Sequence, residues 1–188
     1  MSYGIDRNQA LDLVHQHIHS PNLIKHCLAS EAVMRALARR LGEDEEKWGL
    51  AGLLHDLDVE QTADDLERHT HQTVAILNRL GVDPEIVEAI RLHNEAAHGD
   101  RRRTIFHHAL AAGETITGLI IATALVYPDR KLASVKPKSV RKRFKEKAFA
   151  AGASREIIRE CEQAGIPLDE FCDLCLQAMQ KIAPELGL

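Results

Sequence analysis

The most constraining feature of the sequence is the segment from Lys47 to Glu60, KWGLAGLLHDLDVE. In it, an almost entirely apolar helical run ends in adjacent histidine and aspartate residues, and the apolar run predicts a buried helix. An imidazole and a carboxylate are costly to bury unless each has a partner. A metal ion suits both groups. We therefore interpret His55 and Asp56 as the centre of a metal site to which other parts of the chain bring further ligands.

The composition is typical of a soluble globular protein. The chain has 188 residues, of which 45% are hydrophobic and 28% charged, so we expect one domain over residues 1–188, with a metal-site core at about 20–128 and C-terminal helices at 129–188 packed on it. The formal net charge of -4 gives no general footprint for a membrane or nucleic acid, and we expect no membrane and no stable nucleic-acid complex. Four cysteines without a signal pattern favour a reduced, cytoplasmic setting.

One apolar run is nearly long enough to cross a membrane. It extends from Ala109 to Tyr127 but carries Glu114, two glycines and three threonines. These residues favour a buried helix over a membrane span.

Signals for the start and the end of a helix recur about ten times, and no alternating β-branched run accompanies them. This pattern predicts an all-α, single-domain bundle of about ten helices. Asp6 to Gln9 fits a capping box, and Thr104 is suited to cap a long helix that ends near Pro128. Cys172 and Cys175 form a C-x-x-C pair inside an expected helix, where packing is a simpler role than zinc or redox chemistry. Other expected helices begin at Pro21, Glu43 and Pro84 or cover His69–Gly81, Ser154–Gly165 and Leu168–Leu186.

Five of the expected helices each carry a candidate metal ligand. His26 falls on an inward-facing stripe, and Glu114 is the only acidic residue in an apolar stretch of small residues. Each histidine alone could be a hydrogen-bonded core residue, and Glu114 alone could be neutral and bonded to His107 or a threonine. His71 is close enough to His69 to be the ligand in its place. Taken together, they predict a shared site. The candidate ligands are His26, His55, Asp56, His69, His93 and Glu114.

This ordered set resembles the HD-domain superfamily of metal-dependent phosphohydrolases. The family pattern is a histidine on one helix, a His-Asp pair on another and a distal aspartate. The resemblance runs from His26 through His55 and Asp56 to the helix of Glu114, which stands where the family has aspartate. The additional His69 and His93 are similar to the two-metal branch that contains the HDIG-type phosphodiesterases, although Asn94 replaces a histidine often found in that branch.

The resemblance implies a helical fold around one or two divalent ions and hydrolysis of a small phosphorylated substrate. A nucleotide or a related phosphomonoester or phosphodiester is the expected class, attacked by metal-activated water. His26, His55, Asp56 and Glu114 would hold one ion, and His69 and His93 a second, with Asp56 as the bridge. Imidazole and carboxylate ligands without thiolate suit Mn, Fe, Co, Ni or Zn.

Two further groups have possible roles in this chemistry. Asp56 and Asp58 are the candidate catalytic residues, since Asp58 could accept a proton or orient the water; an outward-facing surface aspartate is the alternative. The basic segment from Arg130 to Lys147 is either a solvated face or a phosphate site. Its candidate phosphate ligands are Lys136, Lys138 and Arg141.

Two other functions remain open for the same ligands. Four histidines and two carboxylates also resemble the di-iron oxygenases of the HD superfamily, which activate O2. A catalytically weak metal- or nucleotide-binding module is the other alternative, and the glutamate at position 114 is the feature that supports it.

Overall fold

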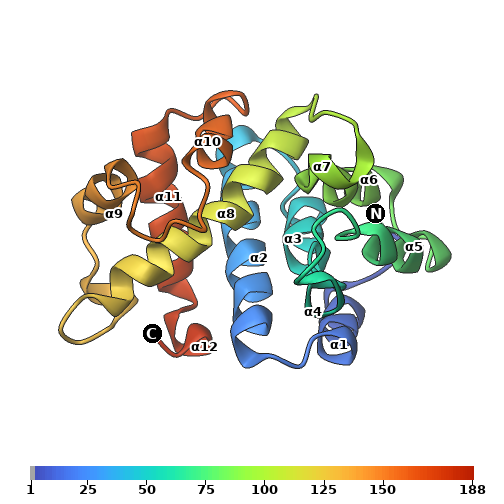
Figure 1. The fold of residues 1–188 in the computed structure, drawn as a ribbon, viewed down its shortest axis with the longest axis horizontal. Coiled ribbons are helices and arrows are strands. Elements are labelled where there is room, and N and C mark those ends of the chain that lie inside the picture. The colour runs from blue at the N-terminus through green and yellow to red at the C-terminus, as the bar shows by residue number, and fades with distance from the viewer. Residues whose placement is uncertain (1–2) are drawn as a thin grey trace.

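The computed structural model describes residues 3–188. Within this range the chain forms twelve α-helices and two short 3-10 helices and no strand, which confirms the all-α prediction (Figure 1). The helices are α1 (Arg7–His17), α2 (Pro21–Leu41), α3 (Glu45–Leu54), α4 (Val59–Thr62), α5 (His71–Arg79), α6 (Pro84–His93), α7 (Glu95–His98), α8 (Ile105–Leu125), η1 (Leu132–Ser134), α9 (Pro137–Lys145), α10 (Arg155–Ile158), η2 (Arg159–Glu162), α11 (Leu168–Lys181) and α12 (Ala183–Leu186).

Several helix boundaries follow directly from the capping residues. The Asp6 side chain accepts the backbone N–H of Gln9 while the Gln9 side chain accepts that of Asp6, which confirms the capping box of α1. The long helix α2 ends at Gly42, whose φ of 76° is in the left-handed region. At the start of α8, the Thr104 hydroxyl accepts the N–H of His107, as expected.

Four expected helices differ from the prediction. The helix expected from Glu43 begins at Glu45, with Asp44 as its N-cap. The helix expected from His69 begins at His71, and the segment from Ser154 forms one α turn followed by the 3-10 helix η2. The helix expected over Leu168–Leu186 is interrupted at Ile182. Pro184 explains this break because proline has no N–H to donate to the preceding turn of α11.

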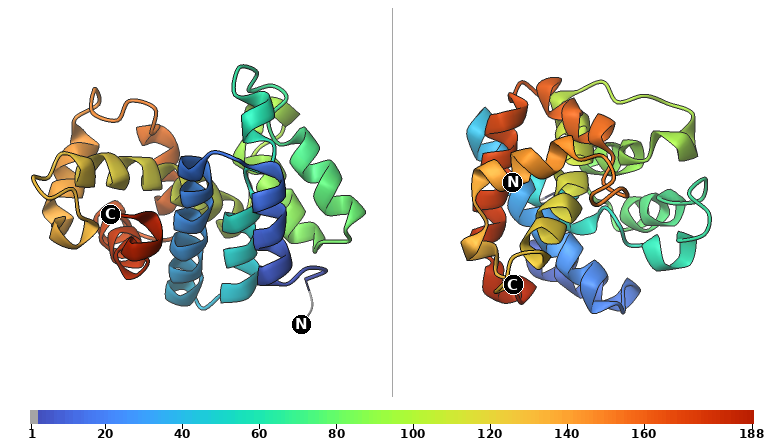
Figure 2. Two further views of the ribbon diagram at one scale, coloured as in Figure 1. Left: turned by 90° about the horizontal axis from the view of Figure 1, so that it is seen from below. Right: turned by 60° about the vertical axis from the view of Figure 1, so that its left-hand side comes forward.

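The long helices α2 and α8 join the two sides of the molecule. Helices α1 and α3 to α7 lie on one side, and α9 to α12 lie on the other (Figures 1 and 2). Helix α2 packs against α3, α8 and α11, and α8 also packs against α6 and α9. Buried apolar side chains from both sides form one continuous core. As a result, residues distant in sequence on α2, α3, α6 and α8 share one interior.

Helix α8 is the one described helix that is long and apolar enough to cross a membrane by length and composition. In its most apolar window, 61% of the residues are buried inside the protein. Its side chains pack instead in the core, and Phe106 near its start stacks on Trp48 of α3 with ring centroids 5.0 Å apart. This is the packing of a core helix.

Helices α2 and α3 approach closely at Gly52. A Cβ atom on Gly52 would lie 2.6 Å from the backbone oxygen of Ser30 on α2. Gly118 on α8 differs, because nothing lies within 4 Å of a Cβ built there. The first glycine therefore sets the spacing of two helices, whereas the second leaves room for a side chain.

We expect Gly52→Ala to lower the free energy of unfolding by about 1–3 kcal/mol, since the helices must separate to admit the methyl group. Gly118→Ala is the matched control and should raise it by about 0.5–1 kcal/mol, because alanine favours an exposed helical position. Urea titration of both variants measures the difference. Equal changes of the same sign in both proteins would contradict the close helix contact.

Candidate metal centre

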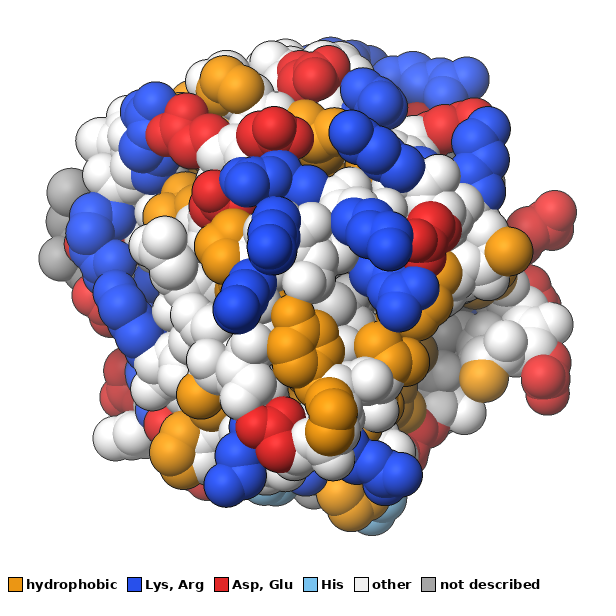
Figure 3. Space-filling view, turned by 90° about the vertical axis from the view of Figure 1, so that its left-hand side faces the viewer, with side chains coloured by type: hydrophobic (Ala, Val, Ile, Leu, Met, Phe, Trp, Pro, Cys, Tyr) orange, Lys and Arg blue, Asp and Glu red, His pale blue; other side chains and the backbone are white. Residues whose placement is uncertain are grey.

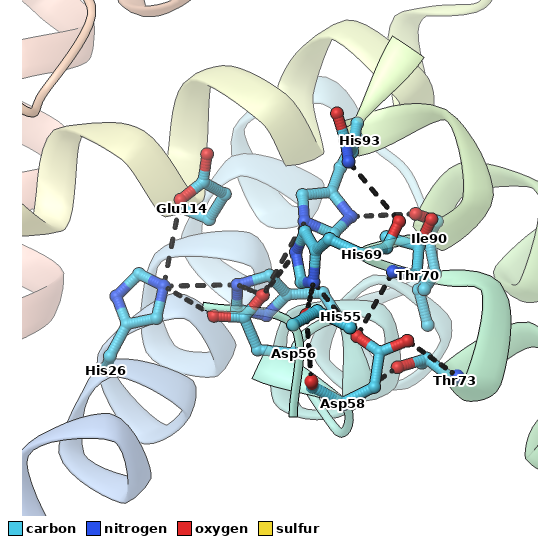
Figure 4. A network of polar contacts seen from close by, with 12 residues as sticks. His26, His55, Asp56, Asp58, His69, Thr70, Thr73, Ile90, His93 and Glu114 are labelled. Atoms are coloured by element: carbon cyan, nitrogen blue, oxygen red, sulfur yellow. Dashed lines mark hydrogen bonds and ion pairs between the residues drawn. The ribbon is translucent and has the colours of Figure 1, made fainter. Parts of the chain in front are cut away.

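All six predicted ligands come together in one buried cluster (Figure 4). They arrive from five different segments of the chain. His26 lies on α2, His55 and Asp56 follow the last residue of α3, His69 lies in the turn before α5, His93 is the last residue of α6 and Glu114 lies in the middle of α8.

Asp56 is at the middle of this cluster, and four imidazoles face its carboxylate. Its Oδ1 atom lies 3.5 Å from Nε2 of His55, 3.2 Å from Nε2 of His69 and 3.6 Å from Nε2 of His93. Its Oδ2 atom lies 3.6 Å from Nε2 of His26. Asp56 is therefore placed to bridge two groups of ligands.

The ring nitrogens also face one another directly. The Nε2 atoms of His26 and His55 are 3.1 Å apart, and those of His69 and His93 are 3.2 Å apart. Glu114 completes the cluster with Oε2 at 3.7 Å from Nε2 of His26. The arrangement brings four nitrogens and two carboxylates to one small volume.

In these rings, the hydrogen bond made by Nδ1 shows which nitrogen carries the proton. Nδ1 of His55 donates to the carbonyl oxygen of Gly52 at 2.9 Å, and Nδ1 of His93 donates to that of Ile90 at 2.7 Å. A carbonyl oxygen only accepts, so both rings carry their proton on Nδ1. Nε2 of each ring then presents a lone pair to the cluster.

The same assignment holds for His26. Thr117 donates its hydroxyl hydrogen to the backbone oxygen of Glu114 at 2.7 Å, so its oxygen is free to accept. Nδ1 of His26 lies 2.9 Å from that oxygen and donates to it. Thr117 is a residue that the sequence interpretation missed, although its position one turn after Glu114 on the same helix was a usable signal.

Asp58 holds His69. Its side chain is fully buried, so the surface alternative for Asp58 is wrong. Its Oδ1 atom accepts from Nδ1 of His69 at 2.9 Å and from the N–H of Thr70 at 3.1 Å, while Oδ2 accepts the N–H groups of Gln72 and Thr73 at 3.0 and 3.1 Å. A carboxylate at the start of α5 is also favoured by the helix dipole.

These bonds explain why His69 precedes the helix rather than opening it. Thr70 has a φ of 84°, a left-handed conformation that is unfavourable for a β-branched residue. The bonds from Asp58 hold the turn in that shape. Both Asp58 oxygens are occupied by protein donors, so the geometry gives this residue a positioning role rather than the contact with water that the sequence suggested.

The donor set fits a divalent metal ion. The Nε2 lone pairs of His26 and His55, which are 3.1 Å apart, repel one another unless a cation lies between them. The outward nitrogens are each held by an acceptor, which is the arrangement of metal-binding histidines. Two overlapping sets have all their donor atoms within 4.8 Å of one another, namely His26, His55 and Glu114, and His55, Asp56 and His93.

The pKa values of His55 and Asp56 agree with such a site, whereas burial raises the pKa of Glu114, whose Oε1 accepts the hydroxyl of Thr115. Burial lowers the pKa of His55 to about 3, which keeps the ring neutral and able to bind a metal. Burial alone would raise the pKa of Asp56, but the facing imidazoles hold it well below its usual range. For His69, burial is outweighed by hydrogen bonds to Asp56 and Asp58, and its pKa rises to about 9. A proton on His69 thus offsets part of the negative charge of Asp56 and Asp58 when a metal is absent, and metal binding would displace it.

The predicted phosphate ligands lie elsewhere. Lys136, Lys138 and Arg141 belong to α9 and its N-terminal flank, and the backbone N–H of Lys136 donates to the hydroxyl of Tyr127 beyond the end of α8. Thirteen residues separate Tyr127 from Glu114, which corresponds to about 20 Å along a helix. Arg141 is already paired with Asp173 through two contacts of 2.6 Å. The structure therefore does not bring these residues to the metal cluster.

Arg102 is a second residue that the sequence interpretation missed. Its Nη1 atom donates to the backbone oxygens of Leu92 and His93 at 2.9 and 3.1 Å, and two further N–H groups bind Glu160 at 2.7 Å each. It thereby fixes the end of α6 against η2. Nothing in the polar loop before α8 distinguished Arg102 from its neighbours Arg101 and Arg103.

A comparison with protein families identifies the class. The family model described as HD domain matches residues 23–126, which include all six candidate ligands. The chain belongs to the HD-domain family, whose members are generally metal-dependent hydrolases. No curated protein matches the chain.

His69 and His71 provide a direct test of the ligand set. We expect His69→Ala to lose most of the metal that the wild type carries, because its Nε2 faces Asp56, whereas His71→Ala should retain it because the exposed His71 ring donates only to the backbone of Ala97. Elemental analysis of the purified proteins measures both. Loss of metal in the His71 variant alone would reverse the assignment.

Asp58→Asn should lower metal affinity by about 10- to 100-fold, because the amide cannot accept all four hydrogen bonds that hold His69 and the turn. It should also lower the free energy of unfolding by about 2 kcal/mol or more. Asp64→Asn is the control, as this residue is exposed in the same connection and should change stability by less than about 0.5 kcal/mol. Metal titration and urea unfolding give the two values, and unchanged affinity in the Asp58 variant would refute its positioning role.

Proposed function

We propose that the protein is a metal-dependent phosphohydrolase that cleaves a phosphate ester. The substrate class that we favour is a nucleotide or a related small phosphomonoester or phosphodiester. The observation that carries the proposal is the convergence of four Nε2 atoms on the carboxylate of Asp56. This donor set suits a hydrolytic metal centre rather than a closed structural zinc site.

His26, His55, Asp56, His69, His93 and Glu114 would hold one or two ions of Mn, Fe, Co, Ni or Zn. When bound, such ions supply an acidic water and neutralise the charge on a phosphoryl group. The protein's part is to orient the ligands through Gly52, Ile90, Thr117 and Asp58 and to keep the back of the centre dry. His55 is completely buried, so the cluster is closed on that side.

The open side of the cluster lies at His26 and Glu114. Their side chains are 21% and 18% exposed, compared with 10% or less for the other four ligands. These two residues come from α2 and α8, so a substrate would approach between those helices. Since Lys136 and Lys138 lie on a different part of the molecule, the phosphate charge would have to be neutralised at the centre itself.

A panel of phosphomonoesters, cyclic nucleotides and dinucleotides tests the proposal. With Mn²⁺, Mg²⁺ or Zn²⁺ and without oxygen, the wild type should release phosphate or cleave the diester, and Asp56→Ala should lower kcat/KM by about 10³-fold or more through loss of the bridging ligand. Asp64→Ala is the control and should be as active as the wild type.

Two results would contradict the proposal. Turnover that requires iron and consumes O2 would assign the centre to the di-iron oxygenases. A protein that retains metal and cleaves no member of the panel would indicate a binding module. Oxygen uptake, phosphate release and metal content measured on one preparation separate these functions.

A further inference from the structure

The strongest feature outside the metal cluster is the basic segment, residues 130–147. It contains nine lysines and arginines and a single acidic residue, Glu146, which gives a formal net charge of +8. The whole chain has a net charge of -4, so the other 170 residues carry -12. The positive charge is therefore confined to a short part of a protein that is otherwise acidic.

Most of these cations have no acidic partner. Within residues 3–188, Arg141 pairs with Asp173 and Arg143 with Glu146. The other seven form no ion pair in this described part of the chain, whereas ten of the fifteen lysines and arginines outside the segment do. The seven unpaired and exposed residues are Arg130, Lys131, Lys136, Lys138, Lys142, Lys145 and Lys147.

The segment is rigidly attached to the protein. Leu132, Val135, Val140 and Phe144 are buried in the core, so its polar side faces solvent. Arg155 fixes the chain after α9 by donating to successive backbone oxygens. The acceptors are Arg143, Phe144, Glu146, Phe149, Ala150 and Ala153. The cations are thus presented from an ordered scaffold, and Figure 3 shows lysine and arginine side chains distributed over this face.

The arrangement indicates an extended anionic partner. Like charges held close together repel one another, and a polyanion relieves that repulsion. The cations extend from Arg130 to Lys147 rather than around a single point, and α9 alone, with nine residues, is about 13 Å long. One strand of a duplex presents a phosphate about every 3.4 Å along the helix axis, so that length corresponds to about four phosphates.

We propose that this face binds the phosphate backbone of a nucleic acid without reading its sequence. Six of the seven unpaired cations are lysines, which act as point charges and lack the planar fork with which arginine recognises a base edge. The neighbouring Tyr127 bonds Ser139 through its hydroxyl at 2.7 Å and is half-buried, and Phe144 of the segment itself is buried. The proposal revises the expectation of no nucleic-acid complex and does not depend on the proposed hydrolase activity.

An anionic membrane fits the same face less well. A membrane-binding amphipathic helix inserts its apolar side, but the apolar residues of α9, Val140 and Phe144, are packed in the core. The neighbouring Leu125 and Val126 are exposed, at 48% and 53%, yet two side chains make a small apolar contact. Charge alone is therefore the main attraction that this face offers.

Fluorescence anisotropy with labelled single strands of RNA and DNA of about 16 nucleotides tests the proposal on the full chain. Both should bind whatever their base sequence. With about four phosphates contacted, affinity should fall about 50-fold between 50 and 200 mM salt, since the slope for single strands is about 0.7 per contact. Absence of binding at 50 mM salt, or binding that is insensitive to salt, would overturn it.

Paired charge reversals locate the site. Lys136→Glu with Lys138→Glu should weaken binding at least tenfold, and loss of folding would not explain this, because acidic residues at the start of α9 favour the helix. The matched control is Arg68→Glu with Arg79→Glu. Both arginines are exposed and lie outside the segment, and the two substitutions change the net charge by the same amount. The affinity of the control for nucleic acid should stay within twofold of that of the wild type. Equal weakening in both double variants would show that net charge alone causes the effect and would overturn the assignment.

Two competitors identify the class of partner. Vesicles with about one third anionic lipid and a poly-glutamate peptide, each added at the same charge concentration, should displace the RNA less well than unlabelled RNA. Stronger binding of the wild type to either one, lost in the Lys136 and Lys138 double variant, would assign the face to that partner instead of a nucleic acid.

Discussion

The main constraint on the site is the close approach of imidazole nitrogens that carry no hydrogen, with Nε2 of His26 and Nε2 of His55 3.1 Å apart. The outward nitrogens of His26, His55 and His93 donate to fixed oxygens, so the inward lone pairs of these rings face each other and Asp56 without a hydrogen between them. A cation between these nitrogens removes that repulsion. A proton on His69 does so partly, as its raised pKa indicates, and a divalent ion does so more completely. The site is thus arranged for a charge that the chain itself does not supply.

The helical frame brings the ligands together because four of them lie at or beside a helix end, while His26 and Glu114 lie within α2 and α8, which pack together. Gly52 lets α3 approach α2, and its carbonyl oxygen then fixes the ring of His55. Arg102 ties the end of α6 to η2. At these two positions the contacts that orient the ligands are also contacts between packed helices, so stability and metal affinity should respond to the same changes.

The sequence predicted the fold class and the candidate ligands because both depend on local patterns. Capping residues and apolar stripes specify helices, and a histidine that ends an apolar stripe is buried wherever that helix packs. The positions of Asp58 and of the basic segment could not be predicted in this way. Asp58 becomes buried because the chain returns from α4 in a left-handed turn at Thr70, and Lys136 is separated from the cluster by the second half of α8. Both depend on contacts between distant segments, which periodicity does not encode.

The distribution of charge separates the two proposed activities. Outside residues 130–147 the chain carries a formal net charge of -12, which disfavours the approach of a free phosphate ester to that part of the protein. Attraction of a small substrate must then come from the bound ions, whose charge is the largest in the site. A polyanion would instead bind at α9, which lies about 20 Å from the metal centre along α8. The two sites would therefore respond differently to added salt, since a contact made at a buried ion is screened far less than contacts made by exposed lysines.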